Sequence, residues 1–457
     1  NSHARAENTR VIVMNKSLQI YVSSTLPSMG INGVDAITFN SWALSVIRHA
    51  TKGKAFFKYR ELPEFVEKIK FSNGILGALS QFVRQQVRDV DAAISREFLT
   101  NEKLFKLWKE SHNKAIQPRL KDFKHDVSES NLPIKEKQVA LDYVQNLLTD
   151  QEDYVGDLYK LLSDEKLLGS FLPADPKLGE HLSYLSRMVD KNRRKNYLDY
   201  YDMSLILRLI QLKYGGLPNK HGGISEFDHL VVDEAQDFGP VEFSIMMDSV
   251  GDKRDLTIVG DVSQKILFSR KFIGWENILD NLEIKKDTLI QLEVSFRCTV
   301  PIMNLARKVE GRKDPVSFGR PGSPVIWHRA VDQNDFLETL AGWVKGLMEK
   351  DPYKLIALIC RYPKQAMELK DDLERMVSCE VRIGHRDQFS FEPGVIISNI
   401  HQIKGLEFDA VALINPSEEF YPSKNIESRN MIYVGITRAQ EDLLVIGNNS
   451  FSKVLLS

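Results

Sequence analysis

The chain alternates short apolar runs of strand length with longer segments of helical periodicity. Val11–Met14 is one such run, and the next is Asp35–Phe39. Between them a helical pattern runs through Leu18–Leu26, which Pro27 and Gly30 are expected to end. Strand, helix and strand in this order predict a βαβ unit, so these residues are expected to open an α/β core.

Residues from about 48 to 200 carry a different pattern. Apolar residues recur there at three- and four-residue spacing, as at Leu76, Leu79, Phe82 and Val83. The segment is also rich in residues that favour helices. We therefore expect a helical insertion that interrupts the first α/β core.

Two later apolar runs end in polar side chains. His229–Val232 is followed directly by Asp233 and Glu234, and the next apolar run is followed by Gln264. An acid at a strand tip can hold the Mg²⁺ that bridges the β- and γ-phosphates of a nucleotide, and the next acid can orient or deprotonate the attacking water. An amide just beyond a strand can contact the γ-phosphate. The alternative for the acidic pair is a solvated strand end.

A second α/β pattern follows Arg297, which ends an apolar run that starts at Leu292. The later runs of strand length are Val325–His328, Leu355–Cys360, Val381–Gly384, Val395–Asn399, Ala410–Ile414 and Leu443–Ile446. Such short, apolar runs are typical of strands buried in a parallel sheet. The second half of the chain is therefore expected to form its own sheet.

Five motifs occur in order along the chain: Asp233-Glu-Ala-Gln-Asp237, Gly260-Asp-Val-Ser-Gln264, Phe296-Arg297, His401-Gln-Ile-Lys404-Gly-Leu-Glu407-Phe and Tyr433-Val-Gly-Ile-Thr437-Arg438-Ala439. This ordered set resembles the superfamily I DNA helicases of the UvrD/Rep type. The resemblance implies an α/β fold with two RecA-like parallel-sheet domains and a helical insertion in the first. It assigns residues 1–47 and 200–290 to the first domain, 48–199 to the insertion and 291–457 to the second domain.

The resemblance also implies ATP and Mg²⁺ as cofactors, and a role for each motif residue. Asp233 would hold Mg²⁺, Glu234 would act on the water, and Gln264 would sense the γ-phosphate. Arg297 and Arg438 would reach the γ-phosphate, where a guanidinium supplies bidentate, permanent charge; a surface ion pair is the alternative for each. The remaining motif residues would bind the nucleotide or couple its state to the DNA groove: Glu407 (at the ribose), Gly405, Lys404, His401 and Thr437.

Aromatic and basic residues are candidates for contact with DNA. Phe39 and Trp42 lie in a segment that loosely matches a strand-binding box of this family. Phe268 lies in Leu267-Phe-Ser-Arg270, which departs from the Tyr-x-Trp-Arg usual in the family, but its ring could still stack on a base. These rings can stack on bases, although core packing is an equal alternative for Phe39 and Trp42. The basic run Lys191–Lys195 is a candidate for a local groove, with a solvated helix face as its alternative.

The chain departs from the resembled family in two further ways. The phosphate-binding loop Gly-x-x-x-x-Gly-Lys-[Ser/Thr] occurs nowhere in the sequence, so this chain is expected to hydrolyse ATP poorly. We expect that the native loop precedes Asn1. The stretch between Arg297 and His401 holds most of the second core, which leaves no room for a second large insertion. This favours a compact, helicase IV-like branch.

Composition agrees with a water-soluble motor. The net charge is −1, so attraction to DNA must come from a local groove and not from the whole molecule. The three cysteines have no metal-type spacing, and no apolar run is long enough to span a membrane. With no secretory signal visible, the cytoplasm is the expected location.

The expected function is thus an ATP-dependent helicase or translocase that moves 3′ to 5′ on single-stranded or partly duplex DNA. RNA polymerase or repair proteins are candidate partners. The alternative is a non-hydrolysing, helicase-like scaffold that binds nucleic acid or a polymerase. Retained motif acids and arginines favour the motor, whereas the missing phosphate-binding loop favours the scaffold.

Overall fold

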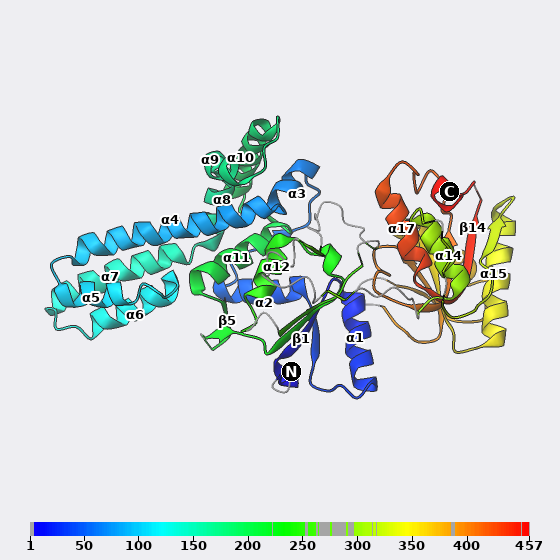
Figure 1. Ribbon diagram of the computed structural model, residues 1–457, viewed down its shortest axis with the longest axis horizontal. Coiled ribbons are helices and arrows are strands. Elements are labelled where there is room, and N and C mark those ends of the chain that lie inside the picture. Colours follow the sequence, from blue (N-terminus) through cyan, green and yellow to red (C-terminus); the bar gives the residue numbers. More distant parts are fainter. Residues whose placement is uncertain are drawn as a thin grey trace.

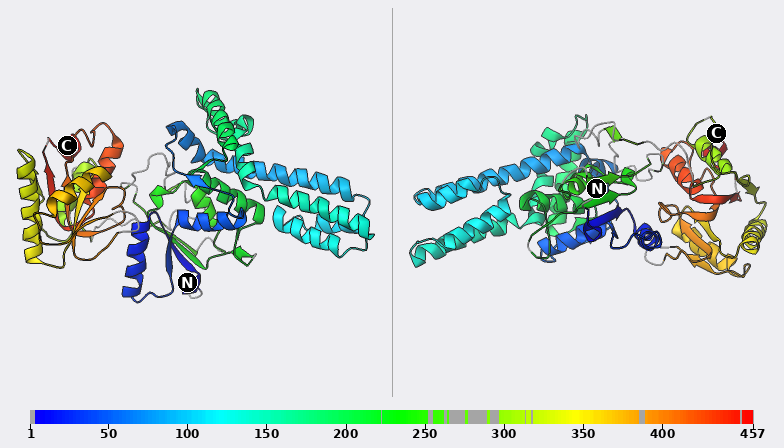
Figure 2. Two further views of the ribbon diagram at one scale, coloured as in Figure 1. Left: turned by 180° about the vertical axis from the view of Figure 1, so that it is seen from behind. Right: turned by 60° about the horizontal axis from the view of Figure 1, so that its bottom comes forward.

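The protein contains two parallel β-sheets with helices around them, and a helical insertion that projects from the first sheet (Figure 1). The arm of the insertion and the second sheet lie at opposite ends of the molecule in every view (Figure 2). The computed structural model describes residues 4–221, 223–251, 255–261, 264, 275–276, 289–290, 297–312, 314–316, 318–384, 389–448 and 450–456.

The first sheet has the strand order β2-β1-β7-β8, and its strands pair in parallel. Its strands are β1 (Thr9–Val13), β2 (Asp35–Thr38), β7 (His229–Val232) and β8 (Leu256–Ile258). The helices of this unit are α1 (Lys16–Ser28), α2 (Phe39–Ala50), α11 (Asp202–Tyr214) and α12 (Pro240–Met247), with the short helices η1 (Ala6–Asn8) and η2 (Ala235–Asp237) and the hairpin β5 (Leu217–Pro218) and β6 (Ile224–Ser225). Strand β1 thus pairs with a strand that lies beyond the whole insertion.

Two local boundaries differ from the sequence-based expectation. Pro27 does not end the first helix, because it lies in the last turn of α1, which continues to Ser28. Phe39 does not end the second strand but begins α2. The Thr38 hydroxyl caps that helix by accepting a hydrogen bond from the Ser41 backbone N–H at 3.1 Å.

The insertion contains a long arm and a compact base. Its elements are β3 (Phe57–Lys58), α3 (Glu64–Lys70), α4 (Asn73–Phe98), α5 (Glu102–Glu110), α6 (Ile116–Ser128), α7 (Ile134–Gln151), α8 (Tyr154–Ser163), α9 (Glu165–Phe171), α10 (Leu178–Arg194) and β4 (Leu198–Asp199). The arm, α4–α7, has its own core around Phe98, Trp108 and Phe123. The base shares one hydrophobic cluster with the first sheet. None of the helices in the described ranges has the length and apolar character that a membrane crossing requires.

A buried ion triad holds the insertion to the first unit. The Lys70 ammonium, at the end of α3, lies 2.7 Å from the carboxylate of Asp199 and 2.6 Å from that of Asp202. All three side chains are almost completely buried. The Asp199 backbone N–H also donates to the Asp202 carboxylate at 3.0 Å. The triad therefore ties the first helix of the insertion to the point where the chain returns to the core.

The second sheet is six-stranded and parallel, in the order β11-β12-β10-β13-β14-β9. Its strands are β9 (Ile326–Arg329), β10 (Leu355–Cys360), β11 (Val381–Ile383), β12 (Gly394–Asn399), β13 (Phe408–Ile414) and β14 (Ala439–Gly447), with helices α14 (Val300–Val309), α15 (Gln333–Lys350), α16 (Pro363–Leu373), α17 (Ile426–Ile436) and α18 (Lys453–Leu456). Every residue of β10 and β12 is buried, as expected for strands covered on both faces. The predicted fold class, two parallel-sheet units with a helical insertion in the first, is confirmed.

Candidate functional site

The carboxyl end of β7 carries two adjacent acids. The Asp233 carboxylate accepts a hydrogen bond from the Glu234 backbone N–H at 2.8 Å. Glu234 has a φ of 53°, which is uncommon for a residue with a side chain and turns the chain sharply where the strand ends. Burial, and next the charge of Glu234, raise the pKa of Asp233 above its ordinary value. A cation bound between the two acids would offset the burial and the mutual repulsion of their negative charges.

A continuous hydrogen-bonded chain leads from these acids to the second sheet. The Gln236 side-chain amide donates to the Glu234 carboxylate and accepts from the Asp261 backbone N–H at 2.9 Å. The Asp261 carboxylate accepts from the Gln264 amide at 2.9 Å. The Gln264 carbonyl in turn accepts from the Arg438 guanidinium at 2.6 Å. Side chains from both sheet units are therefore connected through polar contacts.

Lys404 makes a second connection between the units. Its ammonium lies 2.6 Å from the Asp237 carboxylate and 3.8 Å from that of Glu234. Gly405, which follows it, has a φ of 81°. A Cβ at Gly405 would come within 2.8 Å of the Leu18 side chain, so glycine is required both by the backbone angle and by the close approach of α1.

The two predicted arginines lie in different surroundings. Arg297 is partly exposed and pairs with the Glu407 carboxylate at 2.5 Å, while Gln440 donates to the same carboxylate at 2.8 Å. Arg438 is 0% exposed and donates to the backbone carbonyls of Val434 and Leu406. It directly follows the C-cap residue of α17 and directly precedes β14.

The predicted residues of the site do converge. The fields of Arg297 and Arg438 both act on Asp233, and Arg438 also lies within electrostatic reach of Glu234 and Glu407. Two acids that could hold a cation therefore share one site with two guanidinium groups that could hold phosphate oxygens.

Phe39 and Trp42, two of the aromatic candidates for DNA contact, do not lie at this site. Phe39 is 4% exposed and Trp42 is 7% exposed, and their rings pack against Phe238 and Phe227 in the first core. For both rings the structure corresponds to the core-packing alternative. Phe268 lies outside the described residues, as do residues 292–296 of the expected strand before Arg297. Thr437 is buried, and its hydroxyl donates to the Val434 carbonyl at 3.2 Å.

The structure adds residues that the sequence analysis did not single out. Gln236 and Asp237 stand inside the acidic motif, yet only the folded chain shows that they contact Asp261 and Lys404. Asn15 follows β1 as Asp233 follows β7, and its amide donates to the Lys404 carbonyl at 3.4 Å. Its position after a strand of the same sheet was the available signal, because the carboxyl ends of parallel strands meet at one edge.

His401 lies beside a further arginine. The Arg361 guanidinium, just beyond the end of β10, is 3.5 Å from the His401 ring nitrogen. Burial of the ring, followed by the positive charges of Arg361 and Lys404, lowers the pKa of His401 to about 4. A lowered pKa means that the proton leaves at lower pH, so the ring is neutral throughout the neutral range.

This electrostatic setting gives a first prediction. In NMR titrations of the ring protons, His401 is expected to change protonation well below the usual histidine midpoint of about 6.5. Substitution of Arg361 by methionine removes one of the two nearby cations and should move the midpoint upward. A His401 midpoint equal to that of an ordinary histidine would contradict the arrangement described here.

The side chains present fit part of a nucleotide site. Mg²⁺ usually takes one or two carboxylates and completes its shell with water and phosphate oxygens. Asp233 and Glu234 meet that need, and no cluster of three metal-ligating side chains is found among the described residues. Arg297, Arg438 and Lys404 supply positive charge around them. The loop that would surround the remaining phosphates is not part of this sequence.

Comparisons with known proteins find DNA helicases among the proteins of similar sequence. DNA helicase II of Haemophilus influenzae is 28% identical over 134 residues, which cover 27% of this chain and 18% of that protein. ATP-dependent DNA helicase UvrD2 of Mycobacterium bovis is 28% identical over 166 residues, covering 34% of this chain and 24% of that protein. The chain thus spans about a fifth to a quarter of the length of these relatives.

A solved structure, the C-terminal domain of a possible DNA helicase from Lactobacillus plantarum, shares 19% identity at a TM-score of 0.30, covering 35% of this chain and 92% of that one. Residues 381–450 match the model of the UvrD-like helicase C-terminal domain. Residues 10–271, more than half of the chain, match the model of the UvrD/REP helicase N-terminal domain. The chain therefore belongs to the UvrD/REP helicase family.

Proposed function

We propose that this protein is the motor of an ATP-dependent DNA helicase or translocase that moves 3′ to 5′ on single-stranded DNA. The observation that carries the proposal is the hydrogen-bonded chain from Glu234 through Gln264 to Arg438. It joins the acids at the end of β7 to an arginine from the other sheet unit. A site assembled from two units can convert a change at the nucleotide into relative movement of those units.

Within this proposal each side chain has a defined task. Asp233 holds Mg²⁺, and Glu234 orients or deprotonates the attacking water. Arg297 and Arg438 stabilise charge on the γ-phosphate, and Gln264 reports its presence to Arg438. Bound ATP with Mg²⁺ supplies the phosphoryl group whose transfer to water drives the cycle. Arg297 must then exchange its present partner, Glu407, for phosphate oxygens, which frees the Glu407 carboxylate to accept from the ribose.

Lys404 supplies the proposed link to the DNA. It contacts Asp237 on the nucleotide side, and His401, three positions earlier, lies beside Arg361 at the surface of the second unit. Movement of this turn would therefore change the surface that faces a DNA strand. RNA polymerase or repair proteins are proposed as further partners only through the resemblance of the motifs.

A non-hydrolysing scaffold that binds nucleic acid or a polymerase is the second candidate. One observation favours it: the sequence contains no Gly-x-x-x-x-Gly-Lys-[Ser/Thr] loop. The cationic and acidic side chains would then serve only to hold the two units together.

Steady-state ATP hydrolysis with and without single-stranded DNA distinguishes the two. In a form of the protein that includes a phosphate-binding loop, we expect DNA to stimulate hydrolysis, and Glu234→Gln to lower it by about 10²–10⁴-fold. The 457-residue chain, tested in parallel, should hydrolyse ATP poorly. Oligo(dT) and oligo(U) of equal length would show which nucleic acid acts. Hydrolysis that responds neither to DNA nor to Glu234→Gln would sink the motor proposal and favour the scaffold.

A further inference from the structure

A basic and aromatic surface lies at the base of the insertion, outside the site described above. It is formed by Lys54–Arg60 and Lys191–Lys195. The first segment contains β3 and the second ends α10 and leads into β4, and β3 and β4 pair in parallel with Phe57 opposite Leu198. Segments far apart in the sequence are thus brought side by side. We call this the β3–α10 surface.

The charge of this surface is strongly one-sided. Its two segments contain seven cationic residues and no acidic one, although the whole chain has a net charge of −1. All seven cations are exposed. None of them takes part in an ion pair with a described residue, whereas elsewhere exposed lysines such as Lys114 pair with a nearby acid. Exposed cations that form no ion pair within the described ranges are available to an external anion.

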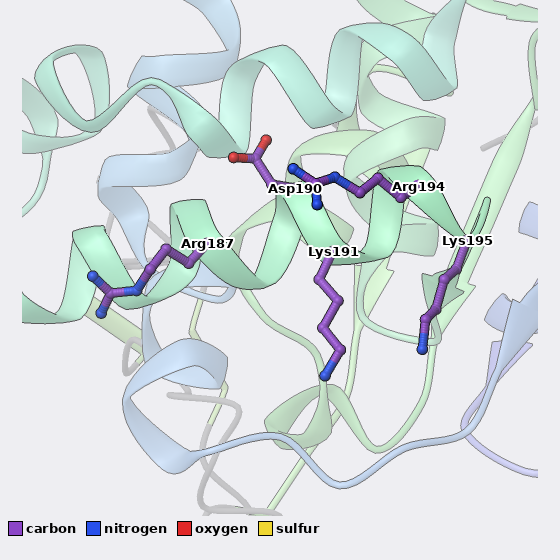
Figure 3. Close-up of a pocket in the computed structure, with 5 residues that line it drawn as sticks. All are labelled: Arg187, Asp190, Lys191, Arg194 and Lys195. Carbon is purple, nitrogen blue, oxygen red and sulfur yellow. The ribbon is translucent and has the colours of Figure 1, made fainter.

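A hollow of about 450 Å³ lies along the last turns of α10, and Figure 3 shows the side chains that line it. It is lined by Arg187, Asp190, Lys191, Arg194 and Lys195, so one acid stands among four cations. The side chains of Lys191, in the last turn of α10, and of Lys195, its C-cap residue, project to the same side in Figure 3. This arrangement suits a chain of anionic groups that runs along the surface.

Exposed aromatic rings accompany the cations. Phe56 is 68% exposed, Tyr59 is 74% exposed, and Tyr200, just after β4, is 42% exposed. Phe57, between the first two, packs instead against the core. The core therefore uses one ring of this segment and leaves its neighbours in water, where a large apolar side chain gains nothing for folding.

We propose that the β3–α10 surface binds single-stranded nucleic acid, with phosphates on the cations of α10 and bases stacked on Phe56, Tyr59 or Tyr200. Basic grooves with aromatic platforms are the common solution for unpaired strands, because every base offers a stacking face. A duplex keeps its bases stacked on one another and would use only the cations. An acidic peptide would likewise leave the rings unused. This inference rests on the proposed function, because the bound nucleic-acid strand is taken to be the one along which the motor moves.

Fluorescence anisotropy of labelled oligo(dT) on the 457-residue chain tests the proposal. The first variant combines Lys191→Ala, Arg194→Ala and Lys195→Ala, and the second combines Phe56→Ala and Tyr59→Ala. Each phosphate contact contributes about 0.7 to the slope of log affinity against log salt for a single strand, so the basic variant should lower that slope by about 2. The aromatic variant should bind about 10-fold more weakly with an unchanged slope.

A matched control removes exposed lysines from the arm, namely Lys103→Ala, Lys106→Ala and Lys135→Ala, and should bind as the wild type does. All variants should keep the wild-type melting temperature, since the altered side chains are exposed. Wild-type affinity in both test variants would overturn this inference alone. The single-strand assignment is wrong if the basic variant loses affinity for duplex and single-stranded DNA equally and the aromatic variant keeps wild-type affinity. The surface would then bind polyanions in general. Absence of DNA binding by the wild-type chain would overturn both proposals.

Discussion

Replacing Arg438 by lysine is expected to lower DNA-stimulated ATP hydrolysis by about 10³-fold, in a form of the protein that includes a phosphate-binding loop. Lysine keeps the positive charge but cannot present two parallel N–H donors to phosphate oxygens. Arg438 also donates to two backbone carbonyls and to Gln264, so alanine would leave buried acceptors without donors. Lysine is therefore the sharper substitution.

Arg297→Ala serves as the matched variant. Its side chain is partly exposed and pairs with Glu407, so its removal should cost little stability while lowering hydrolysis by a similar factor. The melting temperature and the affinity for a fluorescent ATP analogue would be measured alongside turnover. If Arg438→Lys remains folded and hydrolyses ATP within a few-fold of the wild type, Arg438 has a structural role only.

Replacing Lys70 by methionine is expected to destabilise the first unit by about 3–5 kcal/mol, because removal of one partner leaves buried charges uncompensated. Lys70 is the cation between Asp199 and Asp202, and all three side chains are almost completely buried. Urea unfolding would measure the loss, and hydrogen exchange of α3 and β4 would show whether it is local. The triple variant Lys70→Met, Asp199→Asn and Asp202→Asn should recover most of the stability that Lys70→Met alone loses.

The loss of folding stability caused by Lys70→Met should depend on pH. Burial raises the pKa of Asp202 to about 6, and Lys70 opposes that rise. Without Lys70 the folded protein binds a proton at Asp202 more tightly than the unfolded chain does, so stability increases as the pH falls through the folded-state pKa. The variant should thus be closer to the wild type at pH 5 than at pH 8. A loss below about 1 kcal/mol at pH 8 would show that the triad does not hold the insertion in place.

The sequence anticipates the second sheet best. Leu355–Cys360 was expected as a buried strand and is β10, residue for residue. Continuous apolar runs of this kind are typical of strands in a sheet whose two faces are both covered by helices. The meeting of the motif acids with the arginines was implied only by the resemblance of the motifs, because Arg438 follows a helix and not a strand.

Other features required the three-dimensional structure. An aromatic residue after a strand is compatible with either base stacking or the core, and only packing shows that Phe39 and Trp42 are buried. Arg438 can be completely buried because its guanidinium donates to the backbone carbonyls of Val434 and Leu406, and these contacts form only in the folded chain. The joining of Lys54–Arg60 to the end of α10 depends on the pairing of β3 with β4, which are too short to be recognised from periodicity.

The pairing of β1 with β7 constrains how the molecule assembles. β1 lies near the start of the chain, whereas its central partner is made only after the whole insertion. Contacts between such distant segments form slowly because a long loop must close first. The arm has its own hydrophobic cluster of sequence-local helices. During synthesis the arm can therefore become structured on the ribosome before the complete sheet that carries it exists. The edge of β1 that does not pair with β2 must stay exposed until β7 emerges.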